Sequence, residues 1–191
     1  MFDWLRIFEI KNLFNWKIMS LVEIKRGTIN DLVDLIDIGR KTFCETFAKD
    51  NSEENMNKYL EEGFSADKVR AEINDPNSMF YLAMVSDQVI GYLKLNFGQS
   101  QTELNDESSL EIERIYVLKE LHGEGVGQKL YEKAVDIARE KEVNYIWLGV
   151  WEKNPRAIRF YEKNGFVEFD KHVFRLGDDG QTDIMMKLKL K

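Results

Sequence analysis

The chain reads Leu110-Glu-Ile-Glu-Arg-Ile-Tyr-Val117 and, a few residues later, His122-Gly-Glu-Gly-Val-Gly127. The first run alternates apolar and polar side chains, which predicts a β-strand. The glycine-rich run leads into Gly127–Lys141, where apolar residues recur at helical spacing. Glycines let backbone N–H groups turn toward an anion, and a helix start adds about half a positive charge. From the spacing alone, phosphate binding and a plain glycine turn are equally good interpretations.

Two common phosphate motifs do not fit this loop. A dinucleotide-binding fingerprint needs a further glycine at the position of Gln128 and opens a βαβ unit. A nucleoside-triphosphate loop needs Gly-Lys-Ser/Thr, whereas the chain has Gly127-Gln-Lys-Leu130. The sequence therefore argues against both classes of nucleotide-binding protein.

Outward from this segment, the patterning predicts one α/β domain. The expected strands are short runs of alternating or wholly apolar residues: Leu21–Lys25, Met79–Val85, Val89–Phe97, Leu110–Leu118, Tyr145–Trp151, Phe166–Phe174 and Ile184–Leu190. Helices are expected from Thr28 onward, in pieces over Thr42–Asn74, over Gly127–Lys141 and from Pro155. The expected order is βααβββαβαββ, a mixed and mostly antiparallel sheet of about seven strands flanked by helices.

Composition narrows the functional classes. A chain of 191 residues with 43% hydrophobic residues is long enough to bury one core. Its net charge of −7 argues against a nucleic-acid partner and favours a cationic one. The single cysteine, Cys44, excludes an internal disulfide and fits a cytoplasmic protein, and in a helical stretch it is more often a core residue than a nucleophile. The two histidines are not spaced as zinc ligands, so no metal is predicted.

Residues 1–18 are interpreted as an N-terminal appendage, translated from an upstream start codon, ahead of a domain over residues 19–191. They hold no apolar run long enough to span a bilayer and lack the parts of a signal peptide. Their apolar side chains scatter around a helical wheel, which argues against a membrane-surface helix. No membrane partner is expected.

A second motif lies after the glycine loop and helps to interpret it. Asn154 precedes the run Ala157-Ile-Arg-Phe-Tyr-Glu-Lys-Asn-Gly-Phe166, and together with the strand and glycine loop this run resembles the GCN5-related N-acetyltransferases (GNAT). The resemblance covers Leu21 to Leu190 and implies the GNAT fold and an acyltransferase that uses acetyl-CoA. The residues that it implies for coenzyme binding are Ile115, Tyr116, Val117, His122, Gly123, Glu124, Gly125, Val126, Gly127, Gln128, Asn154, Ala157 and Tyr161.

One position departs from the family pattern. The family's loop most often begins with Arg or Gln, whereas this loop begins with His122. A neutral imidazole can donate one hydrogen bond, so weaker coenzyme binding is expected. Asn154 has two equally good uses, as a ligand of the pantetheine arm or as the cap of the helix that begins at Pro155.

Two further segments, Ile146–Asn154 and Gly177–Asp183, are similar to the spermidine/spermine N-acetyltransferases of the PaiA type. This resemblance implies a small cationic amine, a polyamine, as acceptor, in agreement with the acidic composition. Two alternatives remain open. In the first, the enzyme acetylates a protein N-terminus or an antibiotic amine. In the second, the chain is a non-catalytic regulator that binds acyl-CoA. A homodimer is also left open.

Acetyl transfer needs a neutral amine, a donor for the developing oxyanion and a proton for the departing thiolate. The resemblance implies the backbone N–H of Val117 as oxyanion donor and Tyr161 as general acid. It also implies a carboxylate base on the strand, where alternation puts Glu111 and Glu113 on one face. We favour Glu113, although a salt bridge with Arg114 explains either residue equally well.

The acceptor wall of the family lies in the early helical region. Glu45 and Glu53 are the candidates there for binding the substrate amine. Carboxylates in such a charged run more often form a solvated helix face.

Overall fold

The computed structural model describes residues 20–176 and 179–191. Seven strands form one sheet in the order β1-β2-β3-β4-β5-β7-β6, and every neighbouring pair is antiparallel except β4 and β5. In chain order the strands and α-helices are β1 (Val22–Arg26), α2 (Leu32–Phe47), α3 (Glu53–Gly63), α4 (Ala66–Asn74), β2 (Ser78–Val85), β3 (Gln88–Phe97), β4 (Ser109–Val117), α5 (Val126–Glu140), β5 (Tyr145–Trp151), α6 (Pro155–Lys163), β6 (Val167–Leu176) and β7 (Asp179–Lys189).

The predicted α/β class and mixed sheet are confirmed, with one correction to the element order. The early helical region holds three helices, α2, α3 and α4, where the expected order has two. The additional helix start has a local cause, because serine side chains cap both α3 and α4. Ser52 accepts a hydrogen bond from Asn55 N, and Ser65 accepts one from Lys68 N. The predicted appendage over residues 1–18 lies outside the described residues.

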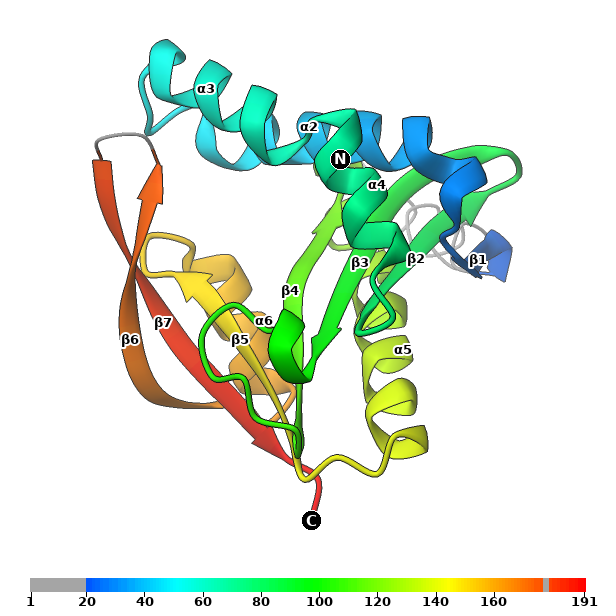
Figure 1. The fold of residues 1–191 in the computed structure, drawn as a ribbon, viewed down its shortest axis with the longest axis vertical. Helices are drawn as coiled ribbons and strands as arrows, with labels where there is room; N and C mark the ends of the chain where they lie inside the picture. The colour runs from blue at the N-terminus through cyan, green and yellow to red at the C-terminus, as the bar shows by residue number, and fades with distance from the viewer. Residues whose placement is uncertain (1–19, 177–178) are drawn as a thin grey trace, which may run out of the picture.

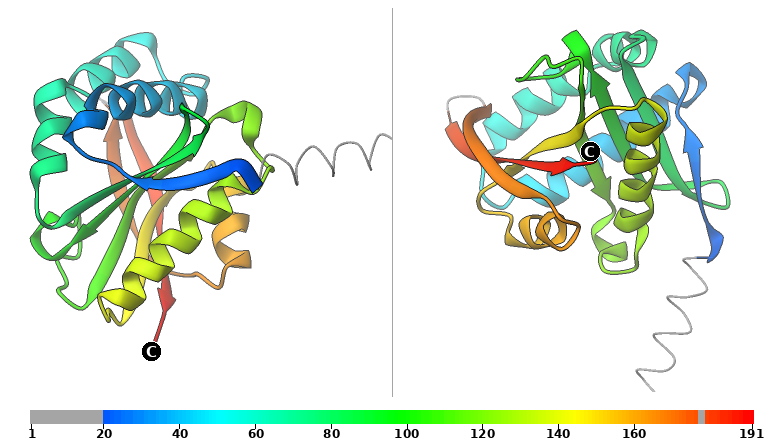
Figure 2. Two further views of the ribbon diagram at one scale, coloured as in Figure 1. Left: turned by 90° about the vertical axis from the view of Figure 1, so that its right-hand side faces the viewer. Right: turned by 90° about the horizontal axis from the view of Figure 1, so that it is seen from below.

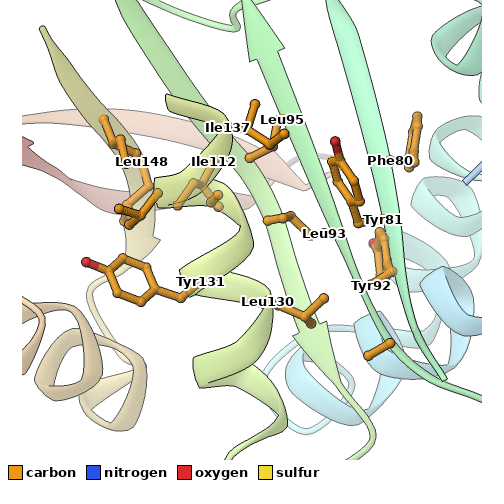
Figure 3. Close-up of a cluster of buried hydrophobic side chains, with 14 of the residues drawn as sticks. Phe80, Tyr81, Tyr92, Leu93, Leu95, Ile112, Leu130, Tyr131, Ile137 and Leu148 are labelled. Atoms are coloured by element: carbon orange, nitrogen blue, oxygen red, sulfur yellow. The ribbon is translucent and has the colours of Figure 1, made fainter. Parts of the chain in front are cut away.

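Helices cover both faces of the sheet (Figure 1). The helices α2 and α4 pack over β2, β3 and β4 on one side, and α5 packs against β3 and β4 from the other, as the two turned views in Figure 2 show. The side chains of α5 that face the sheet, among them Leu130, Ala134 and Ala138, are fully buried. Leu130 and Ile137 of this helix lie in one hydrophobic cluster with Leu93, Leu95 and Ile112 of the central strands (Figure 3).

A smaller aromatic cluster lies apart from this main core. Phe43 and Phe47 of α2, Met56 and Leu60 of α3, Phe64 and Trp151 form it, with Tyr59 and Phe174 packed against it. The Phe43 and Tyr59 rings stack with centroids 4.3 Å apart. Tyr116 contacts both clusters, so the space between them adjoins the end of β4.

Two irregularities of β4 shape that space. Its register against β3 passes from Arg114 to Ile112 while β3 advances one residue, so Glu113 is the extra residue of a β-bulge. The parallel pairing of β4 with β5 covers three residue pairs and ends at Glu111 and Trp147. Beyond that point β4 and β5 are not hydrogen-bonded to each other.

Candidate active site

A cavity of about 320 Å³ lies where β4 and β5 part. Among the residues predicted for the site, the cavity is lined by Glu111, Glu113, Ile115, Tyr116, Asn154, Ala157 and Tyr161. These residues come from β4, from the start of α6 and from the turn before it. The fold thus brings the two sequence motifs to one place.

The backbone of β4 offers hydrogen-bonding groups on the unpaired side. Leu118 N donates to Ile90 O on β3 at 3.0 Å. Because hydrogen-bonded pairs alternate along an antiparallel ladder, the N–H groups of Ile115 and Val117 point away from β3. They face the side where β5 is no longer paired, so a bound molecule can take their hydrogen bonds.

The glycine loop ends directly at the start of α5. Gly123 and Gly125 have φ values of +90° and +81°, in the left-handed region that glycine adopts without strain. Gly125 is the N-cap of α5, and Lys129 N donates to its carbonyl. The preceding N–H groups at Val126 and Gly127 have no acceptor within the helix, as at any helix start. The loop fits a phosphate group, which such a helix N-terminus binds.

The side chain of His122 is turned back to the strand. Its Nε2 lies 2.8 Å from Val117 O, and its pKa is lowered by burial and by the neighbouring Arg156 guanidinium. The neutral ring therefore donates its one proton to Val117 O. Arg156 Nη2 lies 3.4 Å from the same nitrogen, so the positive charge beside the loop comes from α6. No motif in the sequence marks Arg156 for this position.

Glu113 is held by fixed cations. Its carboxylate lies 2.5 Å from Lys94 Nζ and 2.9 Å from Arg114 Nη2, and it accepts a hydrogen bond from Asn96 at 2.6 Å. Glu72 bonds the same two cations, at 3.0 and 3.3 Å. Burial alone would raise the pKa of Glu113, but Arg114 and Lys94 hold it at about 2. The expected ion pair with Arg114 is thus present, and Glu113 stays ionised.

Glu111 has a different environment on the same face. Its carboxylate accepts hydrogen bonds from Asn96 at 3.0 Å and from the Thr102 N–H at 2.9 Å, all from uncharged groups. Its side chain is buried, and this burial raises its pKa. Glu111 is therefore the easier of the two strand carboxylates to protonate.

Tyr161 and Asn154 enter the cavity from α6 and the residue before it. Tyr161 is 7% exposed, its ring packs edge-on against Phe160, and burial raises its pKa. It keeps its hydroxyl proton at neutral pH. The Asn154 side chain accepts a hydrogen bond from Ala157 N at 3.2 Å, which shows its use as a helix cap. A contact of Asn154 with the pantetheine arm stays a prediction.

The two predicted amine ligands lie outside the cavity. Glu45 accepts a hydrogen bond from Lys119 N at 2.8 Å, near the glycine loop, and Glu53 is exposed at the start of α3. Neither lines the cavity. Their role in binding the substrate stays a prediction.

Sequence reasoning missed most of the acceptor side of the cavity. That side is lined by Phe43, Phe47, Tyr59, Phe64, Trp151 and Phe174, together with Thr102, Glu103, His172 and Asp183. These residues come from α2, α3 and the residue after it, β5, β6, β7 and the loop before β4, and no single local motif joins them. Trp151 and Asp183 belong to the two segments singled out from the sequence, Ile146–Asn154 and Gly177–Asp183; residues 177–178 of the latter lie outside the described residues.

The sequence pattern that defines the acetyltransferase (GNAT) family matches residues 41–166. The chain belongs to this family. An uncharacterized N-acetyltransferase from Lactobacillus delbrueckii subsp. lactis is 45% identical over 172 residues, which cover 90% of this chain and 99% of that protein. The spermidine N(1)-acetyltransferase of Thermoplasma acidophilum is 29% identical over 170 residues, 87% of this chain and 96% of that one.

Solved structures agree with this assignment. The crystal structure of PaiA N-acetyltransferase from Thermoplasma acidophilum in complex with coenzyme A superposes with a TM-score of 0.73 at 27% identity, covering 88% of this chain and 98% of that chain. The protein is a GNAT-family N-acetyltransferase, and acetyl-CoA is the acetyl donor of this family.

No helix in residues 20–176 and 179–191 combines the length and apolar character that a membrane span requires. In the same part of the chain, no three His, Cys, Asp or Glu side chains are grouped as metal ligands. The absence of a metal and the cytoplasmic location stay predictions.

Proposed function

We propose that this GNAT enzyme acetylates a small cationic amine, a polyamine such as spermidine. The lining of the acceptor cavity carries this proposal. Aromatic rings from α2, α3, β5 and β6 line the cavity together with the carboxylates Glu103, Glu111 and Asp183. Rings attract an ammonium group through their π faces, carboxylates attract it through charge, and alkyl carbons pack on the rings. The similarity to a spermidine acetyltransferase supports the same acceptor class.

Roles for the coenzyme-binding residues follow from their positions. The N–H groups at the start of α5, in the loop His122–Gln128, would hold the pyrophosphate of acetyl-CoA, with Arg156 adding a positive charge. The backbone of Ile115–Val117, which is unpaired toward β5, would bind the pantetheine arm together with Asn154 and Ala157.

Three groups of the chain would act on the reacting atoms. The Val117 N–H stabilises negative charge on the thioester oxygen, and the Tyr161 hydroxyl protonates the departing thiolate. The acceptor must first lose a proton. We place this role on Glu111, through water, because Lys94 and Arg114 leave the neighbouring Glu113 a very weak base. Glu113, which the sequence favours for this role, stays the alternative base.

One assay tests the acceptor class. Thiol release from acetyl-CoA is followed with spermidine, spermine, diamines, aminoglycosides, streptothricin and short peptides at equal concentration. The proposal expects the highest kcat/KM with a diamine or polyamine. A higher value with a peptide or an antibiotic would assign the enzyme to another acceptor.

An antibiotic amine is the second candidate. A streptothricin acetyltransferase from Streptomyces lavendulae is 30% identical over 110 residues, which cover 57% of this chain and 55% of that protein. Coenzyme binding without turnover of any amine would instead favour the regulatory alternative. The homodimer left open by the sequence is decided by light scattering of the purified protein.

A further inference from the structure

The carboxylates in the cavity differ in what already neutralises them. Glu113 has Lys94 and Arg114 within ion-pair distance, so its charge is fully compensated inside the protein. Glu111 has three hydrogen bonds from Asn96 and Thr102. A substrate cation gains little from a carboxylate that fixed groups have already satisfied.

Asp183 on β7 has no such partners. Its Oδ2 lies 3.9 Å from His172 Nε2, and no described side chain donates a hydrogen bond to it. The same imidazole nitrogen lies 3.9 Å from Glu103 Oε1, so one histidine is shared between two carboxylates. His172 Nδ1 is buried and has no hydrogen-bond partner among the described residues. The pair therefore has unused hydrogen-bonding capacity at the cavity wall.

Gly149, on the neighbouring strand β5, leaves space beside Asp183 and His172 because it has no side chain. Gly149 of β5 also lines the cavity, and a Cβ there would come within 3.3 Å of His172 Cε1 and 3.5 Å of Asp183 Oδ2. Any side chain larger than glycine would narrow the approach to the carboxylate.

The charges that face Asp183 leave it in need of a cation. The titratable groups near it are His172 on β6, Glu152 after β5, Glu103 through His172, and Tyr59 on α3, whose raised pKa keeps its hydroxyl neutral. Burial raises the pKa of Asp183 to about 6, while His172 opposes the rise and Glu152 adds to it. At neutral pH the carboxylate is ionised but poorly compensated, so an entering ammonium stabilises it.

Asp183 and Tyr161 line the cavity beside different hydrophobic clusters, since Asp183 is paired with Trp151 in the sheet. Tyr161 is part of the main core, whereas Tyr59, Phe174 and Trp151, which line the cavity with Asp183, belong to the second aromatic cluster. When one amino group of a diamine reacts near Tyr161, its second amino group, a few carbons away, can therefore reach the side of the cavity that holds Asp183.

We propose that Asp183, supported by His172, binds the second ammonium group of a diamine or polyamine, the one that is not acetylated, and so selects acceptors with two charges. This inference rests on the proposed function and adds to it the residue that binds the second ammonium group of the acceptor. Asp183 is then a specificity residue and takes no part in the proton transfers.

The test compares a diamine with the monoamine of equal carbon chain. For 1,4-diaminobutane and butylamine, the ratio of kcat/KM is measured in the wild type, in Asp183→Asn and in Asp183→Ser. We expect this ratio to fall about tenfold in both variants, because one partner of a partly buried charge pair is removed. The KM for acetyl-CoA should not change. Asp136→Asn, the same chemical change on the exposed face of α5, should keep the wild-type ratio.

The pH dependence gives a second readout. In the wild type the KM for the diamine should rise as the pH falls through about 6, because protonated Asp183 no longer pairs with an ammonium. The rise should be absent in Asp183→Asn. An unchanged diamine preference in both Asp183 variants, or an equal loss in Asp136→Asn, would overturn the inference.

Calorimetry separates this inference from the proposed function. Binding of 1,4-diaminobutane to the enzyme saturated with coenzyme A should weaken about tenfold in Asp183→Asn. If binding weakens in this way but no amine is acetylated, the proposed function fails, and Asp183 remains an ammonium-binding residue without a role in selecting acceptors. If amines are acetylated but neither binding nor the preference depends on Asp183, only the inference fails.

Discussion

Tyr161 carries the most direct expectation about a single side chain. Removal of its hydroxyl in Tyr161→Phe should lower kcat by about 100-fold, the usual contribution of a general acid. The KM for acetyl-CoA should change little, because the ring still packs against Phe160 and Phe166. Steady-state kinetics with spermidine measure both constants, and wild-type turnover in the variant would remove Tyr161 from the mechanism.

Glu111 and Glu113 are separated by their different partners. In Glu111→Gln the acidic limb of the kcat profile, measured at saturating amine, should disappear, because the carboxyl with the raised pKa is gone. Glu113→Gln should keep that limb. It should instead destabilise the fold by about 2 kcal/mol, because Lys94 and Arg114 lose a charged partner. The opposite assignment of the two profiles would return the base role to Glu113.

Arg156 is expected to compensate for the histidine at the start of the loop. Arg156→Gln should raise the KM for acetyl-CoA about tenfold with kcat within about twofold, since a charge-assisted bond to phosphate is lost. Arg159→Gln, an exposed arginine three residues later on α6, is the matched control. Equal effects of the two changes on KM would show that only the overall charge of α6 matters.

At the level of single elements, Asn154 tests what the start of α6 contributes. Asn154→Ala removes the hydrogen bond to Ala157 N and should cost about 1 kcal/mol in urea unfolding. Asn154→Ser keeps a capping oxygen and should restore most of that stability. A KM for acetyl-CoA that stays raised in the serine variant would assign Asn154 to the pantetheine arm as well.

The bulge in β4 shows how one element limited the sequence reasoning. Strict alternation correctly placed Glu111 and Glu113 on one face, but it would also put Arg114 on the opposite face. Because Glu113 is the bulged residue, Arg114 turns to the same face and pairs with it. No local pattern distinguishes a bulged strand from a regular one, so the partners of Glu113 were open until the register was known.

For the whole molecule, the buried charges predict how stability changes with pH. The pKa of Glu113 is lowered from 4.5 to about 2, so its contribution is complete above about pH 4.5 and is lost as the pH falls toward 2. The pKa of Asp183 is raised from 3.8 to about 6, so its protonation stabilises the fold as the pH falls from 6 to 4. Urea unfolding should therefore show a small gain in stability first and a loss below about pH 4.5.

Comparison with variants assigns the two limbs of that curve. Glu113→Gln should flatten the loss at low pH, and Asp183→Asn should remove the gain near pH 6. A loss below pH 4.5 that is the same in Glu113→Gln as in the wild type would show that other carboxylates cause it.

The sequence by itself determined the α/β class, the seven strands, the glycine loop at the start of α5 and the family, because periodicity, caps and glycine motifs act within a few neighbouring residues. Only the tertiary structure decided the parting of β4 from β5, the ion pairs of Glu113, the position of Arg156 beside His122 and the place of the Asp183 carboxylate among aromatic side chains in the cavity. These features join residues that are far apart in the chain, and sheet register and helix packing, which no local pattern encodes, determine where their side chains meet.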